Sequence, residues 1–338
     1  MAVTIKDIAK KAGVSYATVS RALNNRPEVN EKTRREIQKL AEEMGYKPNA
    51  LARSLVTKES KTLGLIIPDI TNPFFPEVAR GVEEAAAQAG YSVFLCNTNW
   101  EEEKERKYLA LLEEKRVDGI ILASVIQDGQ QMLDHIASSN VPLIMINRIL
   151  KNINTHYVVI DNVRGACLVM EHLIENGHRD IAFVGGLSHV EATQERLQGY
   201  KMMLGAYDLP VRPELIRLGS FKRESGYQNA LELLRLSPRP TAIFAANDIL
   251  ALGVLQAAVD LHLRVPGDLA VVGFDDIPFA SYAEVSLTTV AQPKYAMGEI
   301  SAKILIEEIK EGPTREKKKI VLQPELIVRR SSQSKSHS

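Results

Sequence analysis

The sequence predicts an α/β protein in which a small helical domain precedes two lobes built on doubly wound parallel sheets. Three helical patterns occupy the first 47 residues, and the rest of the chain alternates β-branched runs with amphipathic stretches. Strands that alternate with helices favour parallel sheets with right-handed crossovers, and the two sets of strands suggest two lobes. With 338 residues, of which 45% are apolar, the chain is long enough to bury a core in each part.

Local signals mark the first two helices. Thr4-Ile5-Lys6-Asp7 has the spacing of a capping box, and apolar residues then recur at helical spacing, so we expect a helix over residues 5–12. Gly13 tolerates the positive φ of a turn, and Ser15 is suited to cap a second helix that ends at Leu23. This order of helix, glycine turn and helix is typical of a helix-turn-helix.

A third helix is predicted after Asn30, which is suited to cap it, and Gly45 is suited to end it. Its apolar face is made of Ile37, Leu40, Ala41 and Met44. These residues recur at the three- and four-residue spacing of one helix face, so the three helices together form a small packed unit.

The second helix has one face free to read DNA. Val19 and Leu23 lie four residues apart and face inward with Val14. The opposite face presents Tyr16, Ala17, Ser20, Arg21 and Asn24. Arginine pairs with guanine O6 and N7, and an alanine methyl contacts the thymine methyl, so this face fits a major groove. The alternative is a solvated amphipathic helix in a small protein-binding bundle.

Charge supports the DNA interpretation. Residues 1–60 contain 12 lysines and arginines against 7 acidic residues, a net charge of +5, whereas the whole chain is neutral. The remaining residues therefore have a net charge of −5. A basic head on an acidic body indicates a polyanionic partner for the head alone.

The segment after the third helix, 46–55, predicts a helix of about seven residues, which is too short to persist alone in water. IKDIAKKAGVSYATVSRALN followed by GYKPNALARSL resembles the DNA-binding region of the LacI/GalR family of transcriptional repressors. The resemblance implies that the short hinge helix folds on DNA and that Leu55 wedges into a central CpG step in the minor groove. We also expect DNA contacts from Thr4, Thr18, Thr33 and Ala52.

Polar and aromatic residues follow successive predicted strands of the body. The strands are expected at 63–68, 93–97, 119–123, 143–147, 158–161, 181–185, 242–246, 270–274 and 287–292. Ligands of open parallel sheets bind beyond the carboxyl ends of the strands. The residues expected there are Asn72, Phe74, Phe75, Asn99, Asn147, Arg148, Arg196, Phe221, Asn247, Asp275 and Gln292, with Trp100 beside Asn99. Amides, charges and flat rings together suit a polyhydroxyl ligand, although each residue taken singly also fits a cap, a turn or a core.

The body resembles bacterial sugar-binding proteins of the ribose-binding type, whose fold the LacI family shares. NPFF, AAND, VGFD and VAQP match positions that hold sugar in that type. The ribose-binding type has an aspartate just before the arginine at the position of Arg148, whereas this chain has Asn147. The resemblance therefore implies a pentose or a related small sugar or sugar acid as effector, with no assignment to ribose.

The family fold implies three crossings between the lobes, near Asp161, Gln292 and Leu322. We expect a helix-turn-helix domain at 1–47, a hinge helix and linker at 48–61, a two-lobed sugar-binding and dimerisation domain at 62–328, and a polar tail at 329–338. Within the body, lobe 1 is expected at about 62–160 plus 293–321, and lobe 2 at about 161–291 plus 322–328. A ligand that changes the closure of hinged lobes would bias hinge-helix formation, and DNA would bias sugar affinity by the same factor.

A homodimer is expected because helix-turn-helix heads read two half-sites of a pseudo-palindromic operator. The helices near 77–89 and 248–262 are candidates for the interface, although their apolar faces are equally consistent with packing on a sheet. The last ten residues are polar and lack heptads, which argues against a tetramer.

Other functional classes lack their signatures. The chain has no G-x-G-x-x-G after the first strand, no G-x-x-x-x-G-K-[ST] and no H-E-x-x-H, which argues against an enzyme. The spacing of His172, Glu175 and His178 fits a helix end better than a metal site, so neither cofactor nor metal is expected. The remaining alternative is a catabolite-control-type regulator with a phosphoprotein corepressor, but Glu284 stands before Val285 where the resemblance calls for an arginine.

Cellular location is also suggested by the sequence. Cys96 and Cys167 lie far apart in apolar runs and are expected to be buried thiols of a reducing compartment. No apolar run approaches the 18 or so residues of a membrane span, and the N-terminus lacks the apolar segment of a signal peptide. We therefore expect a cytoplasmic protein.

Overall fold

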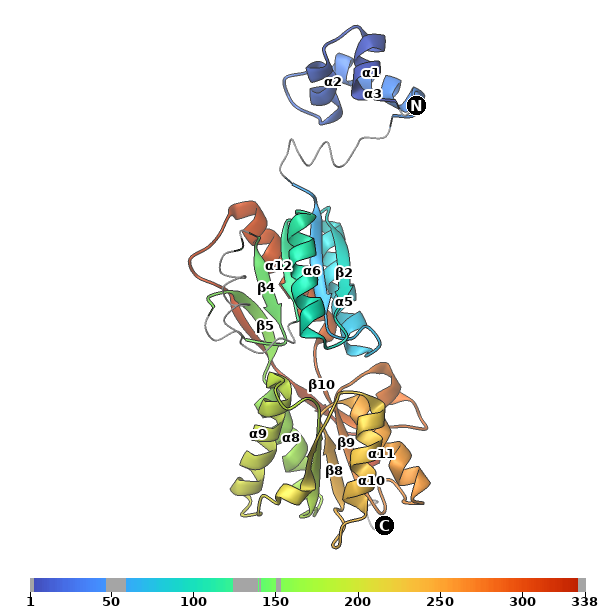
Figure 1. The fold of residues 1–338 in the computed structure, drawn as a ribbon, viewed down its shortest axis with the longest axis vertical. Helices are drawn as coiled ribbons and strands as arrows, with labels where there is room; N and C mark the ends of the chain where they lie inside the picture. The colour runs from blue at the N-terminus through green and yellow to red at the C-terminus, as the bar shows by residue number, and fades with distance from the viewer. Residues whose placement is uncertain (1–2, 47–58, 124–138, 140, 150–152, 334–338) are drawn as a thin grey trace. The chain divides into compact units, whose positions relative to one another are not determined.

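The computed structural model describes residues 3–46, 59–123, 139, 141–149 and 153–333. The chain forms two compact units, Met1–Ser60 and Lys61–Ser338. The proposed hinge residues, including Ala52 and Leu55, lie outside the described residues. Each unit is described separately (Figure 1).

The first unit contains α1 (Ile5–Ala12), α2 (Tyr16–Leu23) and α3 (Glu31–Glu43). Thr4 and Asp7 form the predicted capping box, and Gly13 has a φ of 66° in the turn that follows. The side chains of Ser15 and Asn30 accept hydrogen bonds from the backbone N–H groups of Thr18 and Thr33, as expected of N-caps. The three predicted helices are thus confirmed.

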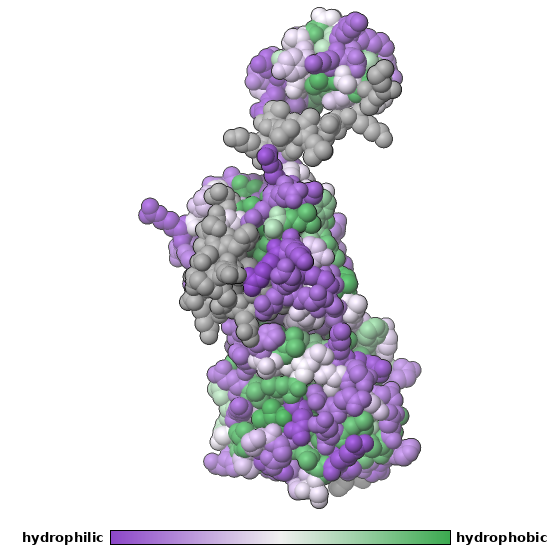
Figure 2. Space-filling view, in the orientation of Figure 1, coloured by the Kyte–Doolittle hydropathy of each residue, from purple (hydrophilic) through white to green (hydrophobic). Residues whose placement is uncertain are grey.

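Lobe 1 is a six-stranded parallel sheet covered by helices on both faces. Its strands are β1 (Thr62–Ile67), β2 (Ser92–Asn97), β3 (Gly119–Leu122), β4 (Leu143–Ile146), β5 (His156–Ile160) and β11 (Lys319–Leu322), in the order β11-β5-β4-β3-β1-β2. Its described helices are α5 (Phe74–Gln88), α6 (Glu102–Glu114) and α12 (Lys294–Glu311). The outer face of α6 is hydrophilic (Figure 2), where Glu102 and Glu103 pair with Arg106 and Lys107 one turn later.

Lobe 2 repeats this architecture. Its strands are β6 (Ile181–Gly185), β7 (Ile216–Leu218), β8 (Ala242–Ala245), β9 (Ala270–Asp275), β10 (Thr288–Ala291) and β12 (Glu325–Ile327), in the order β12-β10-β9-β8-β6-β7. Only β12 runs antiparallel to its neighbour, β10. Its helices are α8 (Asn162–Glu175), α9 (Glu191–Ala206), α10 (Arg223–Leu234) and α11 (Asp248–Asp260), with short 3-10 helices η1 (Pro213–Leu215), η2 (Pro278–Ser281) and η3 (Arg330–Ser332). The predicted fold class is confirmed.

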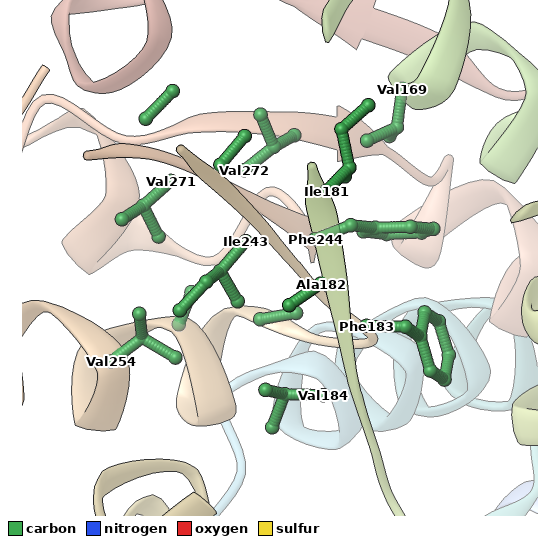
Figure 3. Close-up of a cluster of buried hydrophobic side chains, with 14 of the residues drawn as sticks. Val169, Ile181, Ala182, Phe183, Val184, Ile243, Phe244, Val254, Val271 and Val272 are labelled. Atoms are coloured by element: carbon green, nitrogen blue, oxygen red, sulfur yellow. The ribbon is translucent and has the colours of Figure 1, made fainter. Parts of the chain in front are cut away.

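The core of lobe 2 shows why its strands read as continuous apolar runs. β6 and β8 are buried along their whole length because helices cover both faces of the sheet. Figure 3 shows Val169 of α8 and Val254 of α11 on opposite sides of the central strands. In lobe 1 the sheet likewise separates two cores.

The chain crosses between the lobes three times. It leaves lobe 1 after β5, returns after β10 to form α12, and leaves again after β11 to form β12. The three crossings start from β5, β10 and β11, which are the last or next-to-last strands on the side of each sheet formed by β11 or β12, so this side forms the hinge. Strands β11 and β12 were not among the runs predicted from the sequence because each is only three or four residues long and half exposed.

The end of the described chain belongs to lobe 2. Ser331 and Ser332 are buried in η3, and the Ser331 hydroxyl donates to the backbone oxygen of Val271 (2.6 Å). The polar tail predicted from residue 329 therefore begins too early. Serine hydroxyls can be buried once backbone groups satisfy them, a pairing that composition does not reveal.

The thiols and histidines noted in the sequence are structural. Cys96 is buried as expected, whereas Cys167 is only half-buried, so the expectation that both thiols are buried is wrong for Cys167; burial raises the pKa of each thiol. His172 pairs with the Ser332 hydroxyl (2.8 Å) and His178 with the Thr241 hydroxyl (3.0 Å). Among the described residues, no cluster of three or more histidine, cysteine, aspartate or glutamate side chains could hold a metal ion. No described helix is long and apolar enough to cross a membrane.

Replacing Gly253 of α11 with alanine is expected to destabilise lobe 2. A Cβ at this position would lie closer than 3.0 Å to the backbone oxygen of Arg223 in α10, which no side-chain rotation relieves. Such overpacking costs about 1–3 kcal/mol, measurable by urea unfolding. Gly205→Ala is the control, because its Cβ would meet no heavy atom within 4 Å and alanine favours the helix by about 0.5–1 kcal/mol. Equal stability of the two variants would contradict the close contact.

Candidate functional site

The first candidate site is the exposed face of α2. Val19 and Ala22 are buried in the head, whereas Tyr16 is 63% exposed and Arg21 and Asn24 are also exposed. Ala17 and Ser20 are half-buried on the same helix. The predicted reading face is therefore open to solvent, with Arg21 available to reach base edges.

Three further residues of the head lie at or near helix N-termini. Thr4 precedes α1, and its hydroxyl donates to Asp7 (2.6 Å). The hydroxyls of Thr18 and Ser15 lie 2.9 Å apart at the start of α2, and Thr33 is in the first turn of α3. Helix N-termini attract phosphate through free N–H groups and the helix dipole, which suits contacts to the DNA backbone.

The second candidate site is a cavity between the two lobes that is partly open to solvent. It is lined by Asn72, Phe74, Phe75, Trp100, Asn147, Val190, Ala192, Arg196, Phe221, Asn247, Asp275 and Gln292. An adjoining space shares Phe75, Trp100, Asn147 and Val190 with it and is also lined by Arg148 and Glu191. Every predicted effector residue except Asn99 therefore lines one of these two spaces. These residues follow strands of both sheets, so the two lobes each contribute part of the lining.

Arg196 and Asp275 form a buried ion pair among the residues that line the cavity. Arg196 is 3% exposed, its Nη1 lies 3.7 Å from Asp275 Oδ1, and its guanidinium lies 3.7 Å from the centre of the Phe274 ring. Its Nε donates to Asn162 Oδ1 (2.9 Å), and Nη1 also donates to the backbone oxygen of Ala246. A buried guanidinium needs such partners, which here hold it in one orientation.

Asn72 and Asn247 line the cavity and also accept hydrogen bonds from backbone N–H groups at helix starts. Asn72 Oδ1 accepts from the N–H of Phe74 (3.1 Å) at the start of α5, and Asn247 Oδ1 accepts from the N–H of Leu250 (2.8 Å) at the start of α11. Asn247 is thus the N-cap of α11, whereas Asn72 lies one residue before Pro73, the N-cap of α5, and both residues also line the cavity. Since each oxygen already accepts from a backbone N–H, each NH2 group is the part left to donate to a ligand.

Two acceptors in the cavity have no hydrogen-bond partner among the described residues. Gln292 is 4% exposed, and while its Nε2 donates to Asp275 Oδ1 (2.6 Å), its Oε1 is buried and unpaired. Asn147 has a left-handed φ of 58°, and its buried Oδ1 is also unpaired. Buried acceptors are costly unless a donor meets them, so both oxygens indicate a ligand that offers hydroxyl or N–H donors.

Asn99, predicted to bind the effector, does not reach the cavity. It is exposed, and its amide donates to Glu101 (3.2 Å). Asn99 and Trp100 both have left-handed backbones, with φ of 55° and 62°, and this double turn directs Asn99 outward and Trp100 to the cavity. The lining residues Val190 and Ala192 were also not predicted; Val190 is the N-cap of α9 and Ala192 lies in its first turn, so the available signal was their place at the start of the helix that follows β6.

The pKa of Asp275 predicts a pH dependence of effector binding. Burial raises this pKa to about 6, against the opposing charges of Arg196 and Lys294 and the hydrogen bond from Gln292. A ligand hydroxyl that donates to the carboxylate loses this acceptor on protonation, so affinity is expected to fall from pH 7 to pH 5, by up to about tenfold per unit below the pKa. Binding titrations across this range test the expectation.

The same shift affects stability with a defined sign. Because the folded pKa lies above the ordinary value of 3.8, the contribution of Asp275 to stability is fully present below about pH 4 and is lost as the pH rises through about 6. The control for the binding titrations is Asp275→Asn. This variant should bind the effector more weakly, and position 275 should contribute no pH dependence to its affinity. An unchanged pH profile in this variant would assign the dependence to another group.

Both parts of the chain resemble known protein families. Residues 4–49 match the bacterial regulatory proteins of the lacI family, and residues 170–332 match a periplasmic binding protein-like domain. The chain is 40% identical over 334 residues to the HTH-type transcriptional regulator DegA of Bacillus subtilis (strain 168), with 98% of each chain covered. This chain belongs to the LacI family of transcriptional regulators.

Other LacI-family relatives agree. The chain is 39% identical over 310 residues to the ribose operon repressor of Halalkalibacterium halodurans, covering 92% of this chain and 91% of that protein. Its fold matches the Lac repressor dimer bound to operator and the anti-inducer ONPF with a TM-score of 0.88 at 28% identity, covering 99% of this chain and 100% of that one. Membership of the LacI family confirms the predicted class of DNA-binding regulator and assigns the chain to a group that is not enzymatic.

Proposed function

We propose that this LacI-family chain is a repressor that binds a pseudo-palindromic operator as a dimer, under the control of a small sugar in the interlobe cavity. The observation that supports a sugar effector is the pair of buried unpaired oxygens, Gln292 Oε1 and Asn147 Oδ1, which belong to two residues that line one cavity. Because its target is DNA, we place its action in the cytoplasm.

The chemistry of the cavity supports a sugar of low net charge. The amide oxygens of Gln292 and Asn147 have no hydrogen-bond donor among the described residues, and the NH2 groups of Asn72 and Asn247 can donate to a ligand. The rings of Phe74 and Phe75 form an apolar part of the lining. The two arginines that line the cavity and the adjoining space, Arg148 and Arg196, are matched by Glu191 and Asp275. This balance favours a neutral pentose or a close relative over a sugar acid.

The effector is tested by titrating pentoses, hexoses, sugar acids and sugar phosphates while following the emission of Trp100, the only tryptophan. A saturable change with one compound, accompanied by a rise in melting temperature, is the expected result. If no compound changes the emission or the melting temperature, the sugar assignment fails, and the catabolite-control alternative with a protein corepressor becomes the better explanation.

A narrow apolar stripe on lobe 2 is the proposed dimer interface. Leu252 and Leu255 are half-buried and Val259 is 66% exposed, at helical spacing along α11. The apolar residues of the other candidate, α5, are buried within lobe 1, where Val78 and Val82 join its own core. We therefore assign the interface to α11 rather than α5, and light scattering is expected to give a dimer mass; a tetramer or monomer would contradict it.

Regulation follows from the hinge. Since all three crossings lie on one side of the sheets, a ligand that contacts both lobes alters their closure about that side. If closure biases the hinge helix, sugar and operator must change the affinity for each other by the same factor. Operator titrations with and without the sugar, and sugar titrations with and without operator, should give equal factors.

Leu55→Ala is expected to weaken specific operator binding and to leave nonspecific binding intact. In the proposal Leu55 unstacks a base step, a contact worth a few kcal/mol only on DNA that accepts the kink, whereas nonspecific binding rests on phosphate contacts. The measurement is the affinity for a selected operator and for random DNA at one salt concentration. An equal loss on both DNAs would remove the wedge role.

A further inference from the structure

Two aromatic rings from different lobes stack on each other in the wall of the cavity. Trp100 follows β2 in lobe 1, and Phe221 follows β7 in lobe 2. Their ring centres lie 4.6 Å apart with planes inclined by 23°, which is a stacked arrangement. Both residues also line the cavity, so the stack forms part of its wall.

Sheet topology places this stack opposite the hinge. β2 and β7 are the edge strands of their sheets, and the three crossings lie on the other side, formed by β11 and β12. Lobes that turn about the hinge separate most at the β2 and β7 edges. The stack therefore lies where the cleft opens, and it is a contact made only when the lobes are together.

Both rings are held in place by the backbone around them. A Cβ at Gly186 would lie closer than 3.0 Å to three carbons of the Phe221 ring, so the glycine lets this ring lie against the chain. Trp100 follows another left-handed residue, and its N–H donates to the backbone oxygen of Pro68 (3.2 Å). A left-handed backbone is unfavourable for a residue as large as tryptophan, and such strain is concentrated at ligand sites.

A second contact between the lobes lies beside the stack. The N–H of Ile149 in lobe 1 donates to Glu191 Oε2 in lobe 2 (3.0 Å), and Glu191 and Trp100 line the same adjoining space. The stack and this hydrogen bond therefore both join the lobes beside the cavity.

We propose that Trp100 determines the size of the effector: stacked on Phe221, it closes the cleft over a single sugar ring and excludes sugars of two rings. This inference rests on the proposed sugar-binding function. Because the two faces of the stack are in contact, a second ring leaving the cavity at this edge would have to separate them. A one-ring sugar lets the stack form and gains from the closure that the stack stabilises.

The test uses calorimetry with D-ribose, D-xylose, D-arabinose and D-glucose as one-ring probes and with cellobiose, maltose and sucrose as two-ring probes. The proteins are the full chain, Trp100→Ala, Trp100→Phe and, as a control, Tyr207→Ala, which removes an exposed aromatic ring of lobe 2 outside the cavity. Circular dichroism and melting temperature establish that each variant is folded.

The full chain is expected to bind a one-ring sugar and none of the two-ring sugars. Trp100→Ala should bind the same one-ring sugar about tenfold more weakly and should acquire measurable binding of a two-ring sugar. Trp100→Phe should retain most of the affinity because it keeps a stacking ring, and Tyr207→Ala should match the full chain.

Two results would overturn the role of Trp100 and leave the sugar-binding function standing. One is tighter binding of a two-ring sugar than of any one-ring sugar by the full chain. The other is a Trp100→Ala variant with the affinity and size preference of the full chain. If no sugar of either size binds the full chain, the proposed function itself fails, and the size role fails with it.

Discussion

Replacing Arg196 with methionine is expected to abolish sugar binding and to lower the free energy of unfolding by about 3–5 kcal/mol, the usual cost of removing one partner of a buried ion pair. The guanidinium is the buried partner of Asp275 and the donor to Asn162 and the backbone of Ala246. Its loss removes the guanidinium charge beside a buried carboxylate and takes a donor from two acceptors at once. Urea unfolding and sugar titration measure the two effects.

The control for Arg196→Met is Arg164→Met, which removes an exposed arginine from α8 in the same lobe and is expected to change stability by less than about 0.5 kcal/mol. The double variant Arg196→Met with Asp275→Asn should regain part of the stability, since the unpaired charge is gone, but should not regain sugar binding. Arg196→Met that unfolds at the urea concentration of the unmodified chain would show that the ion pair is dispensable for folding.

Replacing Arg21 with alanine is expected to remove most of the sequence specificity of operator binding. A bidentate arginine–guanine contact is worth about 1–3 kcal/mol per half-site, so a dimer would lose about 2–6 kcal/mol over two half-sites. The exposed position of Arg21 on α2 makes structural damage to the head a poor explanation of such a loss. Fluorescence anisotropy with an operator selected from random DNA measures the change.

Arg35→Ala is the matched control for Arg21→Ala, because it removes the same charge from the same domain. Arg35 is exposed on α3 and pairs with Glu31 one turn earlier, an arrangement that contributes little to stability. Both variants should lose similar affinity for random DNA, but only Arg21→Ala should lose the preference for the operator. If Arg21→Ala lost equal affinity for the operator and for random DNA, Arg21 would contact only phosphate and would not read the base sequence.

Local signals in the sequence were sufficient to predict the helical head. The capping box of Thr4 and Asp7, the glycine turn and the caps of Ser15 and Asn30 involve residues within three or four positions of each other. Interactions of such short range depend little on the rest of the chain, so α1, α2 and α3 begin and end where the sequence predicted.

The cavity was predicted from topology rather than from local signals. Parallel strands bring their carboxyl ends to one edge, so Asn72, Asn147, Asn247 and Asp275 could be grouped although they lie far apart in the sequence. That rule places a residue to within about a turn and says nothing of which side chain points inward. It therefore did not separate Asn99 from Trp100, because the backbone dihedral angles of these two neighbours decide the direction of each.

By itself the sequence determined the helical head, the two parallel-sheet lobes, the family and most of the cavity wall, since these depend on periodicity, caps and strand order. Only the tertiary structure decided which polar atoms are paired. The ion pair of Arg196 with Asp275, the unpaired oxygen of Gln292 and the stack of Trp100 on Phe221 each join residues that are brought together only when the sheets and lobes have packed. Pairing over such separations depends on differences of an ångström or less in backbone position, which no pattern of residue types specifies.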